Sequence, residues 1–106
     1  MFIEMKIYRT YPGRAPAFAK LYVEKGLPVQ AETQGGFMGM YQTEFGDVND
    51  VILMWRHDSV EARRQNRAAL AAAPAWQAFM TEAAPMVIHE ENRMMTPSEG
   101  AADFVA

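Results

Sequence analysis

The sequence predicts an α+β fold in which helices cover one face of a four-stranded antiparallel sheet. Three observations support this prediction. The 106 residues contain four extended segments; helical stretches separate the first from the second and the third from the fourth; and a short turn joins the middle two. The resulting order, strand-helix-strand-strand-helix-strand, is that of the ferredoxin-like or split βαβ arrangement.

The first half of the chain supplies two strands and a helix. Apolar and polar side chains alternate over residues 2–8, which predicts a strand with two unlike faces. After a Pro-Gly turn, apolar residues recur at helical spacing from Ala15, and we expect this helix to end or kink near Gly26 and Pro28. A glycine pair then opens the second extended run, residues 37–44.

The second half repeats the pattern. Gly, Asn and Asp residues before residues 51–55 predict a hairpin turn, so strands two and three should be antiparallel neighbours. Asp58, followed three residues later by a glutamate, resembles a capping box and predicts a helix from about residue 59 to 73. Pro74 suits the first turn of another helix, and residues 86–95 form the predicted fourth strand.

Composition excludes several classes of protein. Ten Lys and Arg against thirteen Asp and Glu give a net charge of −3, which argues against a nucleic-acid binder. No apolar run is long enough to span a bilayer, and cysteine is absent. An acid at position 4 interrupts any signal peptide, so we expect a cytoplasmic location. We expect one domain over residues 1–96 and a flexible tail over 97–106.

The predicted sheet has one face without helices. We expect that face to carry both polar and aromatic side chains, which suits neither bulk solvent nor a plain core. This predicts a homodimer in which two sheets meet face to face and form a barrel that can hold a ligand. The side chains expected there are Glu4, Lys6, Tyr8, Leu53, Trp55 and His57.

A carboxylate, an ammonium and a phenol share one side of the first strand. Burying Glu4, Lys6 and Tyr8 together costs free energy unless they pair or bind water, so they are candidate ligand-binding residues. The alternative is a structural salt bridge between Glu4 and Lys6.

Strands two and three offer an aromatic wall. Trp55, Tyr41 and Leu53 could together hold a flat organic molecule, and Arg93 of the fourth strand could contribute a charge at the rim. The alternative is that Trp55 and Tyr41 are ordinary apolar residues of the dimer core.

Three residues are candidates for proton transfer. His57 could exchange a proton near neutral pH, with Tyr8 or Glu91 as further candidates. The alternative for His57 is a solvent-facing side chain at the strand end. His89 and Glu91 alternate onto one face but make no metal site by themselves, so we expect neither a metal nor a cofactor.

Four arginines occur in a stretch of twelve residues that leads into the predicted second helix and covers its first half. We expect a solvated helix face paired with Glu61, and binding of an anionic ligand is the alternative. The arginines are Arg56, Arg63, Arg64 and Arg67.

Eight short segments resemble the NIPSNAP family and occur in its order. They are Glu4 to Tyr11, Pro12-Gly13-Arg14, Gly26-Leu27-Pro28, Asn49-Asp50-Val51, Trp55, Asp58-Ser59, Pro74-Ala75-Trp76 and Glu91-Asn92-Arg93. The resemblance covers the chain to about residue 97. It implies a dimeric α+β barrel, in a superfamily that also includes cofactor-independent antibiotic-biosynthesis monooxygenases, haem proteins and ligand-binding modules.

The chain departs from the family pattern at two positions. Leu53 stands where members often have a histidine, and Ala73 where they commonly have an aspartate. No role that rests on that histidine therefore transfers to this chain.

Three classes of function remain open at this point. The first is a homodimeric module that binds a small aromatic or acyl molecule. The second is a cofactor-independent monooxygenase or isomerase, so the sequence leaves open whether the protein is an enzyme. The third is a protein-interaction subunit that docks a partner through Phe104 and Val105 of its tail.

Overall fold

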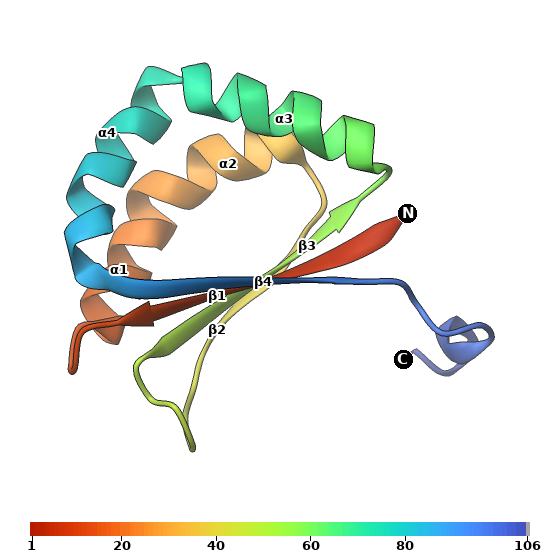
Figure 1. Cartoon of the computed structure of the whole chain (residues 1–106), viewed down its shortest axis with the longest axis horizontal. Helices are drawn as coiled ribbons and strands as arrows, with labels where there is room; N and C mark the ends of the chain where they lie inside the picture. The colour runs from red at the N-terminus through yellow and green to blue at the C-terminus, as the bar shows by residue number, and fades with distance from the viewer. Residues whose placement is uncertain (106) are drawn as a thin grey trace.

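The computed structural model describes residues 1–105 as a four-stranded antiparallel sheet with a layer of helices on one side (Figure 1). The strands are β1 (Phe2–Thr10), β2 (Phe37–Gln42), β3 (Asp50–His57) and β4 (Val87–Met95). Their order across the sheet is β2-β3-β1-β4, and each neighbouring pair is antiparallel. The predicted ferredoxin-like α+β fold is confirmed.

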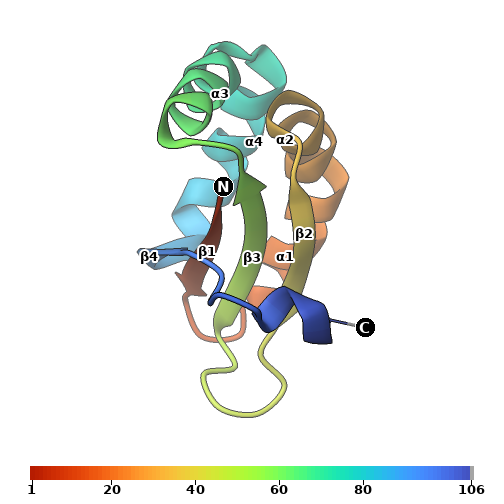
Figure 2. The same cartoon turned by 90° about the vertical axis from the view of Figure 1, so that its right-hand side faces the viewer.

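The helical layer contains two groups that lie side by side above the sheet (Figure 2). The first group is α1 (Ala15–Leu21), η1 (Tyr22–Gly26) and α2 (Leu27–Gln34), and the second is α3 (Val60–Ala72), α4 (Pro74–Ala83) and η2 (Ala84–Met86). The apolar faces of these helices and the sheet enclose the core, which includes Phe18, Leu70 and Phe79.

The sequence predicts that the first helix ends or kinks near Gly26; the helical chain does not end there, but its regular α-helical geometry is interrupted up to that residue. A π-helical turn, η1, joins α1 to α2, and the helical chain continues to Gln34. A Cβ atom at Gly26 would lie 2.8 Å from two ring carbons of Phe79. The glycine is therefore required by a close helix-helix approach rather than by a turn.

Helix α3 begins one residue later than the capping motif suggests. The Ser59 Oγ atom accepts a hydrogen bond of 3.0 Å from the Ala62 amide, so Ser59 is the cap rather than Asp58.

The assignment of the two sheet faces from the sequence is wrong. Glu4 and Tyr8 of β1, with Leu53, Trp55 and His57 of β3, are buried, and we call the helix side on which they lie the covered face. The other side, which no element in residues 1–105 covers, we call the open face. Strand register places on it the largely apolar set Ile3, Met5, Ile7, Ile52 and Met54.

A β-bulge explains why Tyr41 also changes face. Phe37 pairs with Trp55, but the next pair is Gly39 with Met54, so one extra residue enters β2. Because strand side chains alternate, the extra residue places Tyr41 opposite Ile52 on the open face.

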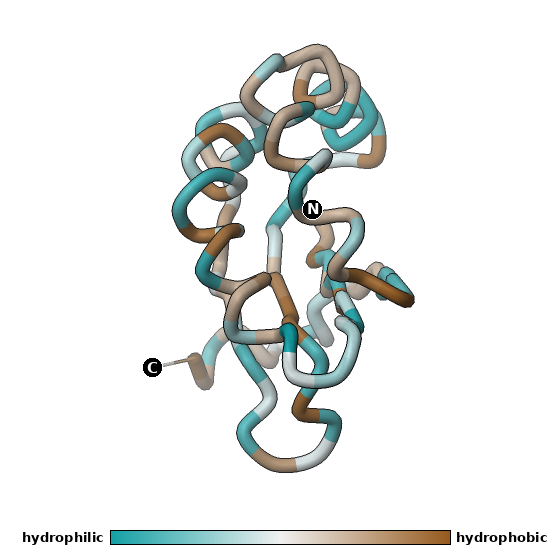
Figure 3. Tube along the Cα trace, turned by 90° about the vertical axis from the view of Figure 1, so that its left-hand side faces the viewer, coloured by the Kyte–Doolittle hydropathy of each residue, from teal (hydrophilic) through white to brown (hydrophobic). Residues whose placement is uncertain are grey.

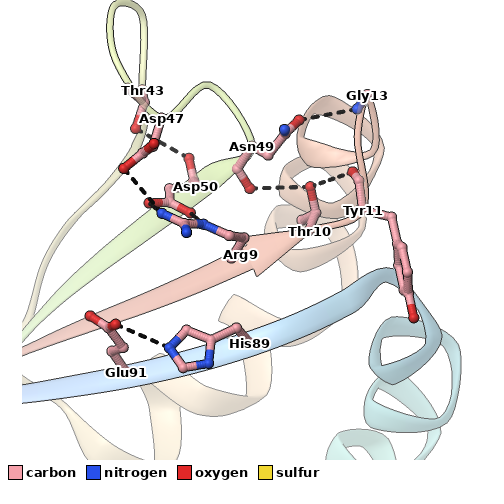
Figure 4. A network of polar contacts seen from close by, with 10 residues as sticks. All are labelled: Arg9, Thr10, Tyr11, Gly13, Thr43, Asp47, Asn49, Asp50, His89 and Glu91. Carbon is pink, nitrogen blue, oxygen red and sulfur yellow. Dashed lines mark hydrogen bonds and ion pairs between the residues drawn. The ribbon is translucent and has the colours of Figure 1, made fainter.

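A polar network fixes one end of the open face (Figure 4). The Arg9 guanidinium donates to both carboxylate oxygens of Asp50, at 2.8 and 3.1 Å, and lies 3.0 Å from Asp47. The Asn49 side chain accepts a hydrogen bond of 3.1 Å from the Gly13 amide. These contacts attach the β2–β3 loop to the end of β1.

Beyond β4, the chain ends in a short 3-10 turn, η3 (Ala101–Phe104), which projects past the sheet (Figure 1). Phe104 is 90% exposed. Residue 106, the last of the predicted tail, lies outside the described residues.

Within residues 1–105, no helix is both long and apolar enough to cross a membrane. In Figure 3 the hydrophobic stretches are short and alternate with hydrophilic ones along the chain.

Candidate functional site

A buried carboxylate lies on the covered face, near the start of β1. Glu4 is only 5% exposed, and three elements converge on it. From α3, Arg63 Nε and Nη2 donate to the two Glu4 oxygens at 2.9 and 3.0 Å; from β3, His57 Nε2 lies 2.8 Å from Oε1; from β4, Asn92 Nδ2 donates to Oε2. We call these four residues the Glu4 cluster.

The Glu4 cluster holds its carboxylate ionised. Burial by itself raises the pKa of Glu4, but the hydrogen bonds from Arg63 and His57 outweigh burial and lower the pKa to about 2. The His57 ring is buried and stacks on Phe2, with ring centroids 5.1 Å apart. The expectation that His57 is a solvent-facing side chain is therefore wrong.

Lys6 extends the polar line along β1 and β4. Its ammonium donates to Asn92 Oδ1 at 2.8 Å, lies 3.4 Å from Glu90 Oε1 and is 5.3 Å from the centre of the Tyr8 ring. The alternative of a salt bridge between Glu4 and Lys6 is wrong, because Glu4 pairs with Arg63 and Lys6 pairs with Glu90.

A cavity of about 370 Å³ adjoins this line, between the helices and the strands β1 and β4. This volume is within the usual range for small-molecule sites. Most of its lining residues are aromatic or aliphatic, but the surface that they expose to the cavity is polar and apolar in similar measure. The lining residues are Tyr8, Phe18, Tyr22, Phe79, Met80, Ala83, Ala84, Val87, Ile88, His89 and Glu90.

Two tyrosine hydroxyls face this buried region. Burial raises the pKa of Tyr8 to about 12 and raises the pKa of Tyr22 well above its ordinary value. The Tyr22 hydroxyl donates to Gln30 Oε1. Both phenols are therefore protonated at neutral pH. The Tyr22 proton is already donated to Gln30, so Tyr8 is the phenol that can donate a hydrogen bond to a ligand in the cavity.

The structure brings together only part of the predicted site. Glu4, Lys6, Tyr8 and His57 do share the covered face. Arg93, whose partner in β1 is Met5, lies on the open face together with Tyr41.

The predicted aromatic wall of Trp55 and Tyr41 is wrong, because the two side chains lie on opposite faces. Trp55 is 2% exposed and packs on Phe37, with ring centroids 5.0 Å apart, and Leu53 is fully buried. Both fill the core.

The three candidates for proton transfer do not meet within one chain. Tyr8 lines the cavity, and His57 is held by Glu4 further along the covered face. Glu91 lies on the open face, where its carboxylate is 3.0 Å from His89 Nε2 (Figure 4).

Several site residues were missed from the sequence. Arg63 was expected on a solvated helix face, yet it turns towards Glu4, whereas Arg64 does form the expected exposed pair with Glu61 at 2.8 Å. Asn92 belongs to a segment that resembles the family, but nothing in the sequence indicated a site role for it; only the pairing of β4 with β1 places it opposite Lys6. Tyr22 and Phe79 were indistinguishable from core residues.

The chain is similar to proteins of one family along nearly its whole length. The model of the NIPSNAP family matches residues 3–101. A NIPSNAP family protein of unknown function from Agrobacterium tumefaciens has a TM-score of 0.91 at 30% identity, with 95% of this chain and 91% of that chain covered. A NIPSNAP domain protein from Burkholderia xenovorans has a TM-score of 0.89 at 32% identity, with 95% and 98% covered.

A more distant likeness concerns the fold alone. A candidate antibiotic biosynthesis monooxygenase from Nitrosomonas europaea has a TM-score of 0.68 at 8% identity, with 92% of this chain and 98% of that chain covered. No curated protein sequence matches the chain.

Proposed function

The chain belongs to the NIPSNAP family, and we propose that it is a homodimeric binding protein that holds a small molecule with an aromatic or acyl portion in the cavity between its helices and its sheet. The observation that carries this proposal is the cavity of about 370 Å³, whose lining combines aromatic and aliphatic residues with the polar residues Tyr8 and Glu90. Such a combination is typical of sites that bury an apolar ligand and orient it with a few polar groups.

The open face supports the homodimer. Its side chains Ile3, Met5, Ile7, Ile52 and Met54 are apolar and only partly buried in the single chain. An apolar sheet face of this extent is a typical interaction surface, and a second copy presents the same surface about a two-fold axis.

Edge charges favour a second copy as the occupant. Glu91 and Arg93 lie two residues apart on β4, both on the open face and at the border of the apolar set. A face that carries both signs can be complementary to itself.

The ligand proposal is tested by narrowing the cavity. Ala84 lines the cavity, whereas Ala78 lies on α4 outside its lining, and both are exposed alanines. We expect Ala84→Leu to weaken binding of the neutral probe 2-naphthamide at least tenfold, because the larger side chain occupies the ligand's space. The matched control Ala78→Leu should change it less than twofold.

Tryptophan fluorescence provides the readout. Trp76 packs against Tyr22 and Phe79, which line the cavity, with ring centroids 6.2 and 5.1 Å away. A bound aromatic compound should therefore change its emission saturably. Equal binding by both alanine variants, or no binding to the wild-type protein at millimolar probe, would refute the proposal.

An enzymatic role for the same cavity is the second candidate. Tyr8 supports it, since a protonated phenol in an apolar cavity can donate a hydrogen bond to a reacting oxygen. Oxygen uptake with an electron-rich quinol that falls at least tenfold in Tyr8→Phe would favour the enzyme over a binding protein.

Partner docking through the tail is the third candidate. The near-complete exposure of Phe104, together with 78% exposure of Val105, supports it. A partner would have to be lost on removal of residues 97–106 while the dimer is retained.

A further inference from the structure

Arg67 lies one helical turn beyond Arg63 on α3, and its side chain is exposed. In Figure 1, α3 runs in the same direction as β1. Four helical residues advance about 6 Å and two strand residues about 6.6 Å, so the step from Arg63 to Arg67 on α3 matches the step from Glu4 to Lys6 on β1. Because Arg63 contacts Glu4, Arg67 lies on the same face of α3, one helical turn further towards the part of β1 that carries Lys6.

The pKa values of two tyrosines support this position of Arg67. Although burial raises the pKa of Tyr8 and of Tyr22, the charge of Arg67 acts on both in the opposite direction. The Arg67 guanidinium is therefore near enough to act on both tyrosines, and both tyrosines line the cavity.

The charges beside the cavity are not balanced. Arg63 is neutralised by Glu4, but Arg67 forms no ion pair with any carboxylate of residues 1–105. Lys6 has one acidic partner, Glu90, at 3.4 Å, and that carboxylate is half exposed. Arg67 and Lys6 therefore have one acidic partner between them, Glu90, which leaves a surplus of one positive charge beside the cavity.

We propose that the ligand of this cavity ends in a carboxylate, which binds between Arg67 and Lys6 while its aromatic or acyl portion occupies the cavity. This inference rests on the proposed function and names the class of its ligand. The planar guanidinium of Arg67 can donate two parallel hydrogen bonds to a carboxylate, and the Lys6 ammonium can donate a third.

Two features favour a carboxylate over a neutral group or a phosphate. A single negative charge balances the surplus beside the cavity, whereas a phosphate would add a second negative charge beside Glu90. The Tyr8 ring, whose centre lies 5.3 Å from the Lys6 ammonium, belongs to the cavity lining and its hydroxyl remains protonated, so it is a further hydrogen-bond donor for the ligand.

The test compares an acid with its neutral amide on the intact protein. We expect the wild-type protein to bind 2-naphthoate at least tenfold more tightly than 2-naphthamide. The variant Arg67→Gln should lose most of that preference, with at least a tenfold loss for the acid and less than a twofold change for the amide.

Two further variants sharpen the result. Arg64 lies on the same helix but pairs with Glu61 in solvent, so Arg64→Gln is the matched control and should leave both affinities within twofold. Glu90→Gln removes the competing carboxylate and should strengthen binding of the acid about threefold.

The outcomes separate this inference from the proposed function. If the amide binds as tightly as the acid, or Arg67→Gln retains the preference, the carboxylate site is wrong while the cavity still binds aromatic compounds. If neither compound binds the wild-type protein at millimolar concentration, the proposed function fails as well.

Discussion

In a small isolated domain one expects charged side chains on the exposed face of a sheet and apolar ones under the helices. Both faces of this sheet depart from that expectation. The covered face, under the helices, holds a carboxylate, an ammonium and a guanidinium, in Glu4, Lys6 and Arg63. The open face, which lies towards the surroundings, carries Ile7 and Ile52 at its centre. The difference shows that β1 keeps charged side chains on the covered face although it has apolar side chains on the open face.

Pairing makes the covered face possible. The Glu4 carboxylate contacts polar side chains of three different elements, α3, β3 and β4, so its burial leaves neither oxygen without a partner. A buried charge without such partners would cost several kcal/mol. The Glu4 cluster therefore also attaches α3 to the sheet beside the cavity.

The open face has no comparable arrangement at its centre. Charged residues occur only towards its borders, such as Arg9 with Asp50 (Figure 4). Burial of apolar surface stabilises association by about 25 cal/mol per Å². The proposed homodimer would remove this face from water.

The largest expected effect comes from placing a charge on the open face. Ile7→Lys puts an ammonium opposite Ile52, where the proposed dimer would have to bury it. We expect the dissociation constant of the dimer to rise at least a hundredfold, as measured by sedimentation velocity. The control Val23→Lys, at a half-exposed position of the helical layer, should remain dimeric. A dimer unaffected by Ile7→Lys would show that the open face is not the interface.

The next effect concerns the covered face. Glu4→Gln leaves Arg63 without its carboxylate, and we expect the free energy of unfolding at pH 7 to fall by about 3 kcal/mol, as measured by urea denaturation. The matched control Glu61→Gln removes an ion pair whose two side chains are more than 60% exposed, and it should cost less than about 0.5 kcal/mol. Similar losses in both variants would show that burial adds nothing to the Glu4 cluster.

Acid should weaken the wild-type protein through the same carboxylate. The folded pKa of Glu4, about 2, is below its unfolded value of about 4.3, so the folded state binds this proton less readily. The stabilisation is therefore complete above about pH 5 and is lost as the pH falls towards 2. The difference in stability between the wild type and Glu4→Gln should shrink over this range, and a constant difference from pH 7 to 2.5 would contradict the assignment.

The smallest effect distinguishes the open face from other surface residues. Met5 and Met54 lie on the open face, whereas Met38 is 52% exposed in β2. If a second copy covers the open face, hydrogen peroxide should oxidise Met5 and Met54 at least fivefold more slowly than Met38, as followed by peptide mass spectrometry. If Met5 and Met54 are oxidised as fast as Met38 in the Ile7→Lys variant, the protection in the wild type is linked to dimer formation.

The elements themselves could be predicted from the sequence because their signals are local. Alternation marked β1, the turn residues marked the β2–β3 hairpin, and Pro74 marked the start of α4. The irregular features were less accessible: no local signal marked the π-helical turn before Leu27, and the close approach of Gly26 to Phe79 joins residues far apart in the chain.

The candidate site could be predicted only in part. Glu4, Lys6 and Tyr8 were singled out because their burial is costly, and that reasoning holds on either face of the sheet. Arg63 and Asn92 were missed because their roles arise from partners 59 and 88 residues away in the chain.

The sequence by itself determined the order of strands and helices, the existence of two unlike sheet faces and the family. The tertiary structure alone decided which face the helices cover, where the bulge in β2 turns Tyr41, and which cations surround Glu4. The physical reason is that alternation along a strand fixes only which side chains share a face. The alternation is the same whichever of the two faces lies under the helices. The choice between the two faces depends on strand register and helix crossovers, which join residues far apart in the chain.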